Sequence, residues 1–415
     1  MATHSASGRP MYTVPSPPTS VVAQQYHRQF PAQPRQPLPS PTGLKPYRLS
    51  LEEILGIGPV GAIRRSGQFV FHCVGDTGGI NYPFDQHEVA LAMQADLGSA
   101  NAPIFFYHLG DVIYYNGERS NFYPQFYEPY QDYHAPIFAI PGNHDGDVAA
   151  GASEPSLAPF VDNFCAVQPH RTSEAQEVAR DAMIQPNVYW TLKAPFVTIV
   201  GAYTNCPEGG YVDAEQAAWL EQEMGAVPKN EALIVALHHP IYSVSGTHIG
   251  SQQMGNLLAD AIRVSNRVPD AVFTGHVHNY QRFTDTMQGQ QVPVIVAGAG
   301  GYWHQHPVMK DPSTGQKLKT PYRIDATTTL ESYEDAHHGY LRVTIAAKSI
   351  SGQYVTVAGP HDPAGTTPKV FDSWTLDLAK HTIGAAQAPS GGGTRRRRTG
   401  AGGSGRTPRP SRRKS

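Results

Sequence analysis

Three features of this sequence predict an α/β fold. Short apolar runs rich in β-branched and aromatic residues alternate with helical patterns along the chain. The runs are continuously apolar, which is typical of strands that are buried on both faces. Several runs end directly on Asp, Asn or His, and the carboxyl ends of parallel strands in such folds share one crevice. We therefore expect a sheet covered by helices, with its functional residues gathered along one edge.

The spacing and continuity of apolar residues predict a first helix and eight strands. A helix is expected at 85–98, where apolar residues from Val89 to Leu97 recur at intervals of three and four. The expected strands are 68–75, 103–110, 136–142, 196–203, 232–239, 270–276, 292–298 and 339–347.

A second helix is expected at 213–225. Asp213 is a suitable N-cap, and Gln216 follows it at the spacing of a capping box. Gly225 is expected to end the helix, because glycine is common just after the last helical residue.

Composition divides the chain into three parts. Residues 1–46 are rich in Pro, Gln and Ser, and residues 385–415 are rich in Gly, Ser and Arg. Neither segment buries enough apolar surface to offset the entropy lost on ordering. We expect two disordered segments flanking one ordered domain at 47–384.

Charge and cysteine content restrict the class of protein. The net charge of −2 hides a division, because residues 394–415 hold nine basic residues and no acidic ones. The rest of the chain is acidic, so we expect contact with nucleic acid only through this tail.

Three cysteines are too few for a disulfide framework, although a single disulfide bond is possible. The sequence has no export leader and no membrane-spanning run, which favours a cytoplasmic location.

Polar residues follow five of the predicted strands. A glycine directly precedes the polar residue in four of these places, and we expect glycine to take positive φ there and turn the chain sharply. Taken singly, each cluster is also typical of an ordinary turn or of surface histidines. Five in succession favour a shared site. The clusters contain Asp76; Asp111 and Tyr114; Asn143, His144 and Asp145; His238 and His239; and His276 and His278.

The residue types indicate a metal centre. Oxygen and imidazole donors without thiolate suit Fe, Mn, Zn or Mg. Seven candidates are too many for one ion that keeps open positions, so we expect two ions sharing a carboxylate. Two ions about 3.5–4 Å apart clamp a phosphoryl group and activate water. A phenol, whose pKa is normally about 10, favours a trivalent ion as its partner. The expected ligands are Asp76, Asp111, Tyr114, Asn143, His238, His276 and His278.

The order of these motifs resembles that of the calcineurin-like metallophosphoesterases. The blocks read D, GDxxY, GNHD, VxxH and GHxH over 68–346. The second block contains a tyrosine, and in this it resembles the purple acid phosphatase branch of the family. The resemblance implies a four-layer α/β/β/α sandwich of two mixed sheets. It also implies a phosphatase that acts on small phosphate esters with Fe(III) and a divalent Fe, Zn or Mn ion.

The resemblance further implies a role for each residue. Asp111 would bridge the two ions, and His144 would contact the substrate or donate a proton. His248, ten residues after His238, falls where a second phosphate-binding histidine can stand. The ferric ion would be held by Asp76, Tyr114 and His278, and the divalent ion by Asn143, His238 and His276.

Other interpretations stay open at this stage. The same fold would serve a phosphodiesterase or nuclease, and the basic tail gives this alternative some support. A non-catalytic binding protein would be expected to have lost ligands, and none is lost. A phosphoprotein phosphatase is disfavoured by Tyr114 and by Thr77 and Gly78, because that branch has a His two residues after its first Asp. The segment 300–308, with Trp303, His304 and His306, has no assigned partner.

Overall fold

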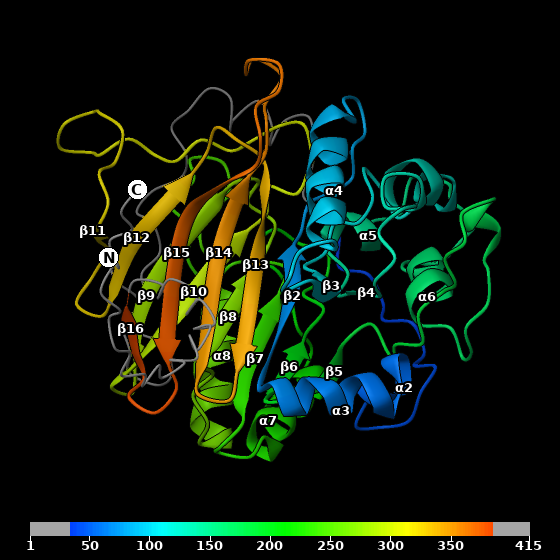
Figure 1. Cartoon of the computed structure of the whole chain (residues 1–415), viewed down its shortest axis with the longest axis horizontal. Helices are drawn as coiled ribbons and strands as arrows, with labels where there is room; N and C mark the ends of the chain where they lie inside the picture. The colour runs from blue at the N-terminus through cyan, green and yellow to red at the C-terminus, as the bar shows by residue number, and fades with distance from the viewer. Residues whose placement is uncertain (1–33, 385–415) are drawn as a thin grey trace, which may run out of the picture.

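The computed structural model describes residues 34–384, which form two mixed sheets flanked by helices (Figure 1). In spatial order, the nine-stranded sheet consists of β1 (Arg48–Ser50), β5 (Trp190–Ala194), β6 (Val197–Gly201), β7 (Ala232–Leu237), β8 (Ala271–Thr274), β10 (Gln290–Ala297), β9 (Tyr280–Met287), β12 (Thr328–Glu334) and β11 (Tyr322–Arg323). The seven-stranded sheet consists of β16 (Thr382–Gly384), β15 (Lys369–Asp377), β14 (Ser349–Thr356), β13 (Gly339–Ala346), β2 (Gln68–Val74), β3 (Pro103–His108) and β4 (Ile137–Ala139).

Helices cover the outer faces of the two sheets and occupy the connections between strands. The longer helices are α3 (Ile57–Ser66), α4 (Phe84–Asp96), α7 (Ala214–Ala226) and α8 (Gln252–Ser265). The shorter ones are α2 (Leu51–Leu55), α5 (Asn143–Gly146), α6 (Ala158–Phe164), the 3₁₀ turns Arg119–Asn121 and Ser173–Ala175, and a π-helical turn at Tyr123–Tyr127. Helix α7 packs on α8 and against β6, while α4 packs on β13. The architecture is the expected four-layer α/β/β/α sandwich.

Aromatic side chains fill the space between the sheets. The ring of Tyr107 on β3 stacks on that of Trp190 on β5, with centroids 6.0 Å apart. Farther along, Tyr280 on β9 stacks on Tyr354 of β14 at 4.0 Å. The Tyr280 hydroxyl also donates a hydrogen bond to Asp372 on β15. The sheets therefore bury each other's inner faces, which explains why the central strands are apolar throughout.

The eight predicted strands are confirmed, with ends that differ by a few residues. Strands β2, β3 and β4 run parallel, as do β6, β7, β8 and β10. The sequence missed the antiparallel strands at the sheet margins, including β12 and β15. Most of their residues are partly buried or exposed, and many are polar, so they lack the continuous apolar signal of the centre.

The two predicted helices correspond to α4 and α7, and only part of the predicted capping of α7 is confirmed. Asp213 is the N-cap of α7, because its carboxylate accepts a hydrogen bond from the Gln216 backbone N–H at 2.9 Å. The Gln216 side chain does not complete a capping box; it bonds instead to both backbone polar groups of Tyr203. Gly225 lies inside the last turn, and the helix ends at Ala226.

Part of the predicted N-terminal arm packs on the body of the protein. Within 34–46 there is no helix or strand, yet Gln36 exchanges backbone hydrogen bonds with the side chain of Asn205. The Gly43 backbone N–H donates to Pro186 O at 2.8 Å. These contacts show that the chain is fixed before residue 47. The rest of the predicted arm, 1–33, and the predicted basic tail, 385–415, lie outside the described residues.

Two further sequence-based expectations concern cysteines and membranes. Cys73, Cys165 and Cys206 are all buried free thiols, so the disulfide that the sequence left open does not form. Across residues 34–384, none of the helices combines the length and hydropathy needed to cross a bilayer.

Candidate metal centre

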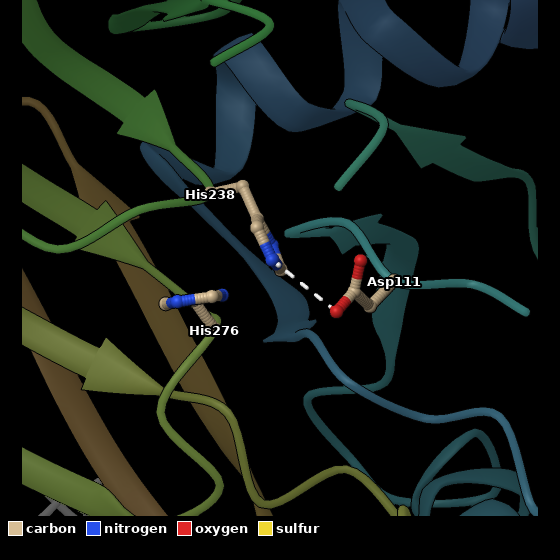
Figure 2. A group of neighbouring side chains, drawn as sticks. All are labelled: Asp111, His238 and His276. Atoms are coloured by element: carbon tan, nitrogen blue, oxygen red, sulfur yellow. Dashed lines mark ion pairs between the residues drawn. The ribbon is translucent and has the colours of Figure 1, made fainter. Parts of the chain in front are cut away.

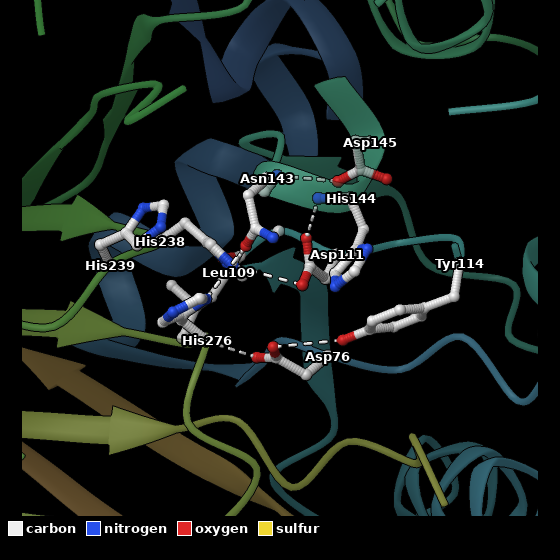
Figure 3. Close-up of polar contacts among 12 residues, drawn as sticks. Asp76, Leu109, Asp111, Tyr114, Asn143, His144, Asp145, His238, His239 and His276 are labelled. Atoms are coloured by element: carbon white, nitrogen blue, oxygen red, sulfur yellow. Dashed lines mark hydrogen bonds and ion pairs between the residues drawn. The ribbon is translucent and has the colours of Figure 1, made fainter. Parts of the chain in front are cut away.

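The candidate site lies where parallel strands of the two sheets end beside each other (Figure 3). The seven-stranded sheet supplies Asp76 after β2, Asp111 and Tyr114 after β3, and Asn143 after β4. The nine-stranded sheet supplies the histidines that follow β7 and β8. All seven predicted ligands are buried, with at most 5 % of each residue exposed. The structure brings them together as two groups of donor atoms: Asp76, Tyr114 and His278, and Asp111, Asn143, His238 and His276.

The first group joins a carboxylate, a phenol and an imidazole. The Tyr114 hydroxyl lies 3.3 Å from Asp76 Oδ1 and 3.3 Å from His278 Nε2. His278 Nε2 lies 3.5 Å from Asp76 Oδ1, which closes the triangle. Donor atoms that surround one cation at bond lengths of about 2.1 Å stand about 3.0–3.4 Å apart in octahedral or tetrahedral geometry. The spacing of these three atoms therefore fits a single ion.

The second group has the same spacing. Asn143 Oδ1 lies 3.0 Å from His238 Nε2 and 3.0 Å from His276 Nδ1. Asp111 Oδ2 lies 3.4 Å from His238 Nε2, and Asp111, His238 and His276 face one another in Figure 2. Asp111 Oδ2 is fully buried and makes no hydrogen bond among the described residues. A buried carboxylate oxygen without a hydrogen bond is costly unless a cation compensates it, so this group also fits a metal ion.

The backbone at the strand ends differs from the sequence prediction. Of the four glycines, only Gly110 has positive φ, at 97°. Instead, the site residues Asp76, Asp111 and His276 adopt φ of 58°, 53° and 66°. Such left-handed conformations cost about 1 kcal/mol or more for residues other than glycine. Hydrogen bonds oppose this cost, since the His276 backbone N–H donates to Asp76 Oδ2 at 2.8 Å.

Glycine is needed at these turns mainly for space. A Cβ added to Gly142 would lie 2.1 Å from Asp111 Oδ1, and one added to Gly275 would lie 2.6 Å from Asp76 Oδ2. Both positions therefore exclude a residue with a side chain, because a carboxylate of the site occupies the space that its Cβ would need. The prediction of positive φ was wrong for Gly75, Gly142 and Gly275. After Gly75 and Gly275 the left-handed conformation is adopted by the next residue, Asp76 or His276.

Asp145 holds two of the site loops together. Its carboxylate accepts hydrogen bonds from the backbone N–H groups of Val112, Ile113 and Gly142, at 2.8–3.2 Å. Burial, together with the Asp111 charge, raises the pKa of Asp145 to about 7, while these three donors favour its charged form. The last residue of GNHD thus fixes the loop that carries Asp111 relative to the start of α5.

The two predicted catalytic histidines both lie at the site. The His144 backbone N–H donates to Asp111 Oδ1 at 2.9 Å, and its ring packs 4.5 Å from the Tyr114 ring (Figure 3). His144 Nδ1 donates to the Tyr115 carbonyl at 2.7 Å. The ring of His248 lies 4.4 Å from that of His276, and His248 Nδ1 is 2.9 Å from Glu208 Oε1.

A comparison with known protein families now becomes informative. Residues 69–280, about half of the chain, match the family model of the calcineurin-like phosphoesterases. The chain belongs to this family.

Several curated relatives are purple acid phosphatases, which places the chain in the purple acid phosphatase-like branch. The Fe(3+)-Zn(2+) purple acid phosphatase 12 of Arabidopsis thaliana is 27 % identical over 52 % of this chain and 45 % of its own length. A 3',5'-cyclic-nucleotide phosphodiesterase of Nostoc is 28 % identical over 37 % of this chain and 50 % of its own length. The chain thus spans half or less of these curated relatives.

Solved structures agree on the fold. A purple acid phosphatase from yellow lupin seeds superimposes with a TM-score of 0.53 at 15 % identity, over 75 % of this chain and 54 % of the other. The structure of PhoD gives a TM-score of 0.51 at 14 % identity, over 78 % and 72 %. At such identities the likeness concerns architecture alone.

Charge in the site of this phosphoesterase is dominated by three groups. Burial opposes the charge on Asp111, but His238 and His144 outweigh it and lower the pKa of Asp111 well below its usual value. Burial likewise opposes protonation of His238, yet the carboxylates of Asp111 and Asp76 raise its pKa to about 9. Burial raises the pKa of Asp76 well above its usual value. The Asp111 carboxylate and the His238 imidazolium therefore balance each other, while burial disfavours charge on Asp76 unless a cation lies beside it.

Sequence reasoning missed the residues that support the site from behind. Tyr302 stacks on Tyr114 with ring centroids 4.1 Å apart, and its backbone N–H donates to Asp76 O. His306 Nδ1 accepts the His278 backbone N–H at 3.1 Å. Both belong to the segment 300–308, which the sequence flagged without a partner. Glu208 carries no sequence signal at all, because its neighbours His248 and His276 are far away along the chain.

Proposed function

We propose that this chain hydrolyses phosphate monoesters at a dinuclear metal centre. The observation that supports this most directly is the pair of donor groups, each with the spacing of one coordination sphere. We assign Asp76, Tyr114 and His278 to Fe(III), and Asn143, His238 and His276 to a divalent Fe, Zn or Mn ion. Asp111 would bridge the two. The phenol of Tyr114 favours the trivalent ion in the first position.

The bound ions would supply Lewis acidity, which activates water and neutralises the charge of the phosphoryl group. His144 would give a proton to the leaving alkoxide. Its Nδ1–H is committed to the Tyr115 carbonyl, so the proton that it gives would leave from Nε2. His248, whose ring lies 4.4 Å from that of His276, would contact a phosphate oxygen. Asp145 keeps the loops that carry Asp111 and His144 in register through its three backbone hydrogen bonds.

Metal analysis combined with visible absorption tests this assignment. The oxidised wild-type protein should contain two ions per chain, one of them iron, and show a phenolate-to-ferric charge-transfer band. Tyr114→Phe should lose the band while the divalent ion is retained. Fully metallated, oxidised protein without such a band would contradict the iron assignment and indicate a Zn or Mn enzyme.

A phosphodiesterase is the second candidate, and the similarity to a cyclic-nucleotide phosphodiesterase favours it. Hydrolysis of p-nitrophenyl phosphate and bis(p-nitrophenyl) phosphate should be compared for the full chain and for a form without residues 385–415. We expect the monoester to react faster in both forms. Faster turnover of the diester, or a preference that depends on the tail, would favour the second candidate.

A further inference from the structure

The three histidines of the candidate centre are oriented in two different ways. His238 Nδ1 bonds to the Leu109 carbonyl at 2.9 Å, and His278 Nδ1 bonds to the His304 carbonyl at 2.8 Å. Both rings therefore present Nε2 to their donor group. His276 is reversed, since its Nδ1 faces Asn143 Oδ1. A ligating histidine usually donates its other N–H to a fixed acceptor that holds the ring in place.

The acceptor available to His276 is Glu208. His276 Nε2 is buried and lies 3.7 Å from Glu208 Oε1, just beyond hydrogen-bond distance. Figure 2 shows one nitrogen of this ring turned toward Asp111 and the other turned away from it. The same Glu208 oxygen is 2.9 Å from His248 Nδ1. One carboxylate thus stands between a candidate metal ligand and a candidate substrate contact.

The loop that carries Glu208 is held firmly. Ser251, the N-cap of α8, donates a hydrogen bond to the Gly209 carbonyl. The Tyr211 backbone N–H donates to Thr204 O at 2.7 Å, and the Thr204 hydroxyl bonds to His239 Nδ1. Glu208 therefore projects from a braced turn, although 45 % of its side chain is exposed.

We propose that Glu208 is a positioning residue that orients His276 toward the divalent ion and His248 toward the phosphate. This inference rests on the proposed function. A third cation held by Glu208, His248 and His276 Nε2 is the competing interpretation, because these three groups lie close enough to share an ion. It is disfavoured because His276 would then have to bind two ions, one through each ring nitrogen, and this requires the fully deprotonated imidazolate.

The test compares Glu208→Ala and Glu208→Gln with the wild type. In Glu208→Ala the Kd for Zn²⁺ at the divalent position should rise about 10–100-fold. Glu208→Gln keeps an acceptor oxygen of the same reach, so it should lose clearly less. With Zn²⁺ saturating, Glu208→Ala should raise KM and the Kd for inorganic phosphate more than it lowers kcat. The control is Glu215→Ala, an exposed carboxylate paired with Lys45, which should leave all these values unchanged.

A double-mutant cycle with His248→Ala separates the two roles. In the His248→Ala background, Glu208→Ala should cause no further loss of phosphate affinity but should still weaken Zn²⁺ binding. Additive losses of phosphate affinity would overturn the role through His248. Unchanged Zn²⁺ affinity in Glu208→Ala would overturn the role through His276. Loss of a third Zn²⁺ equivalent, with the other two bound as in the wild type, would overturn it as well. If the wild type itself binds no pair of ions, the proposed function fails first.

Discussion

The two sheets contribute different chemistry to the candidate centre. Every oxygen donor, from Asp76, Asp111, Tyr114 and Asn143, follows a strand of the seven-stranded sheet, and every imidazole follows a strand of the nine-stranded sheet. Each donor group combines members of both sheets. Metal binding at this place would therefore join the two halves of the sandwich, because neither sheet alone completes a coordination sphere.

The hydrogen bonds that hold the oxygen donors in place also differ from those that hold the histidines. On the oxygen side, backbone amides hold carboxylates, as in the three bonds to Asp145. On the imidazole side, carbonyls or a carboxylate hold the second ring nitrogen. The oxygen side thus supplies the carboxylates, while the imidazole side fixes ring orientation. Left-handed backbone occurs on both sides, at Asp76 and Asp111 and at His276. The predictions that follow test this division.

Asp111→Asn should have the largest effect. The variant loses the buried charge proposed to bridge both ions, so metal content and activity should each fall by more than about 100-fold, the upper end for residues that only support ligands. His144→Ala is the matched comparison: it should keep both ions and slow turnover by about 10²–10⁴-fold. Metal analysis and kinetics on both variants test whether Asp111 binds the ions and His144 does not. Equal metal loss in the two variants would contradict this assignment.

Removing the metals should loosen the contact between the sheets. One ion at 100 times its Kd stabilises the folded state by about 2.7 kcal/mol, so removal of both ions by chelation should lower the Tm by about 5 °C or more. Thermal unfolding with and without chelator measures this difference. In Asp111→Asn the chelator should cause almost no decrease in Tm. A wild-type Tm that does not respond to the chelator would show that the ions do not join the sheets.

Asp145→Ala should test the oxygen side on its own. It leaves three backbone N–H groups without their acceptor, and we expect a loss of about 2–3 kcal/mol in the free energy of unfolding. Denaturant titration measures it. Since the loop that carries Asp111 would lose its tether, metal affinity should also fall. Stability that drops without any change in metal affinity would separate Asp145 from the site.

Asp96, the last residue of α4, offers a smaller effect away from the centre, where it pairs with His72 of β2 and Arg342 of β13. Hydrogen bonds from His72 and Arg342 outweigh burial and lower the pKa of this carboxylate, 16 % exposed, to about 2. A lowered folded-state pKa gives stability that is present above pH 4 and lost as the pH falls toward 2. The contribution is about 2 kcal/mol. Asp96→Asn should remove it at neutral pH and flatten acid unfolding between pH 5 and 2, whereas parallel curves would refute this origin.

The sequence predicted the central strands and the candidate ligands because their signals are local. A continuous apolar run marks a strand buried on both faces, and the residue directly after it is placed at the carboxyl edge whatever the rest of the chain does. The order of five such clusters also sufficed to recognise the family. The marginal strands were missed because their residues alternate or are polar, as in β12.

What the sequence alone determined is therefore the set of donor types and the edge along which they lie. Only the tertiary structure decided which residues carry the left-handed backbone, and that Glu208 stands between His248 and His276. These features depend on contacts between two sheets whose strands are distant along the chain. No local pattern encodes such contacts, because they arise only when the sheets pack face to face.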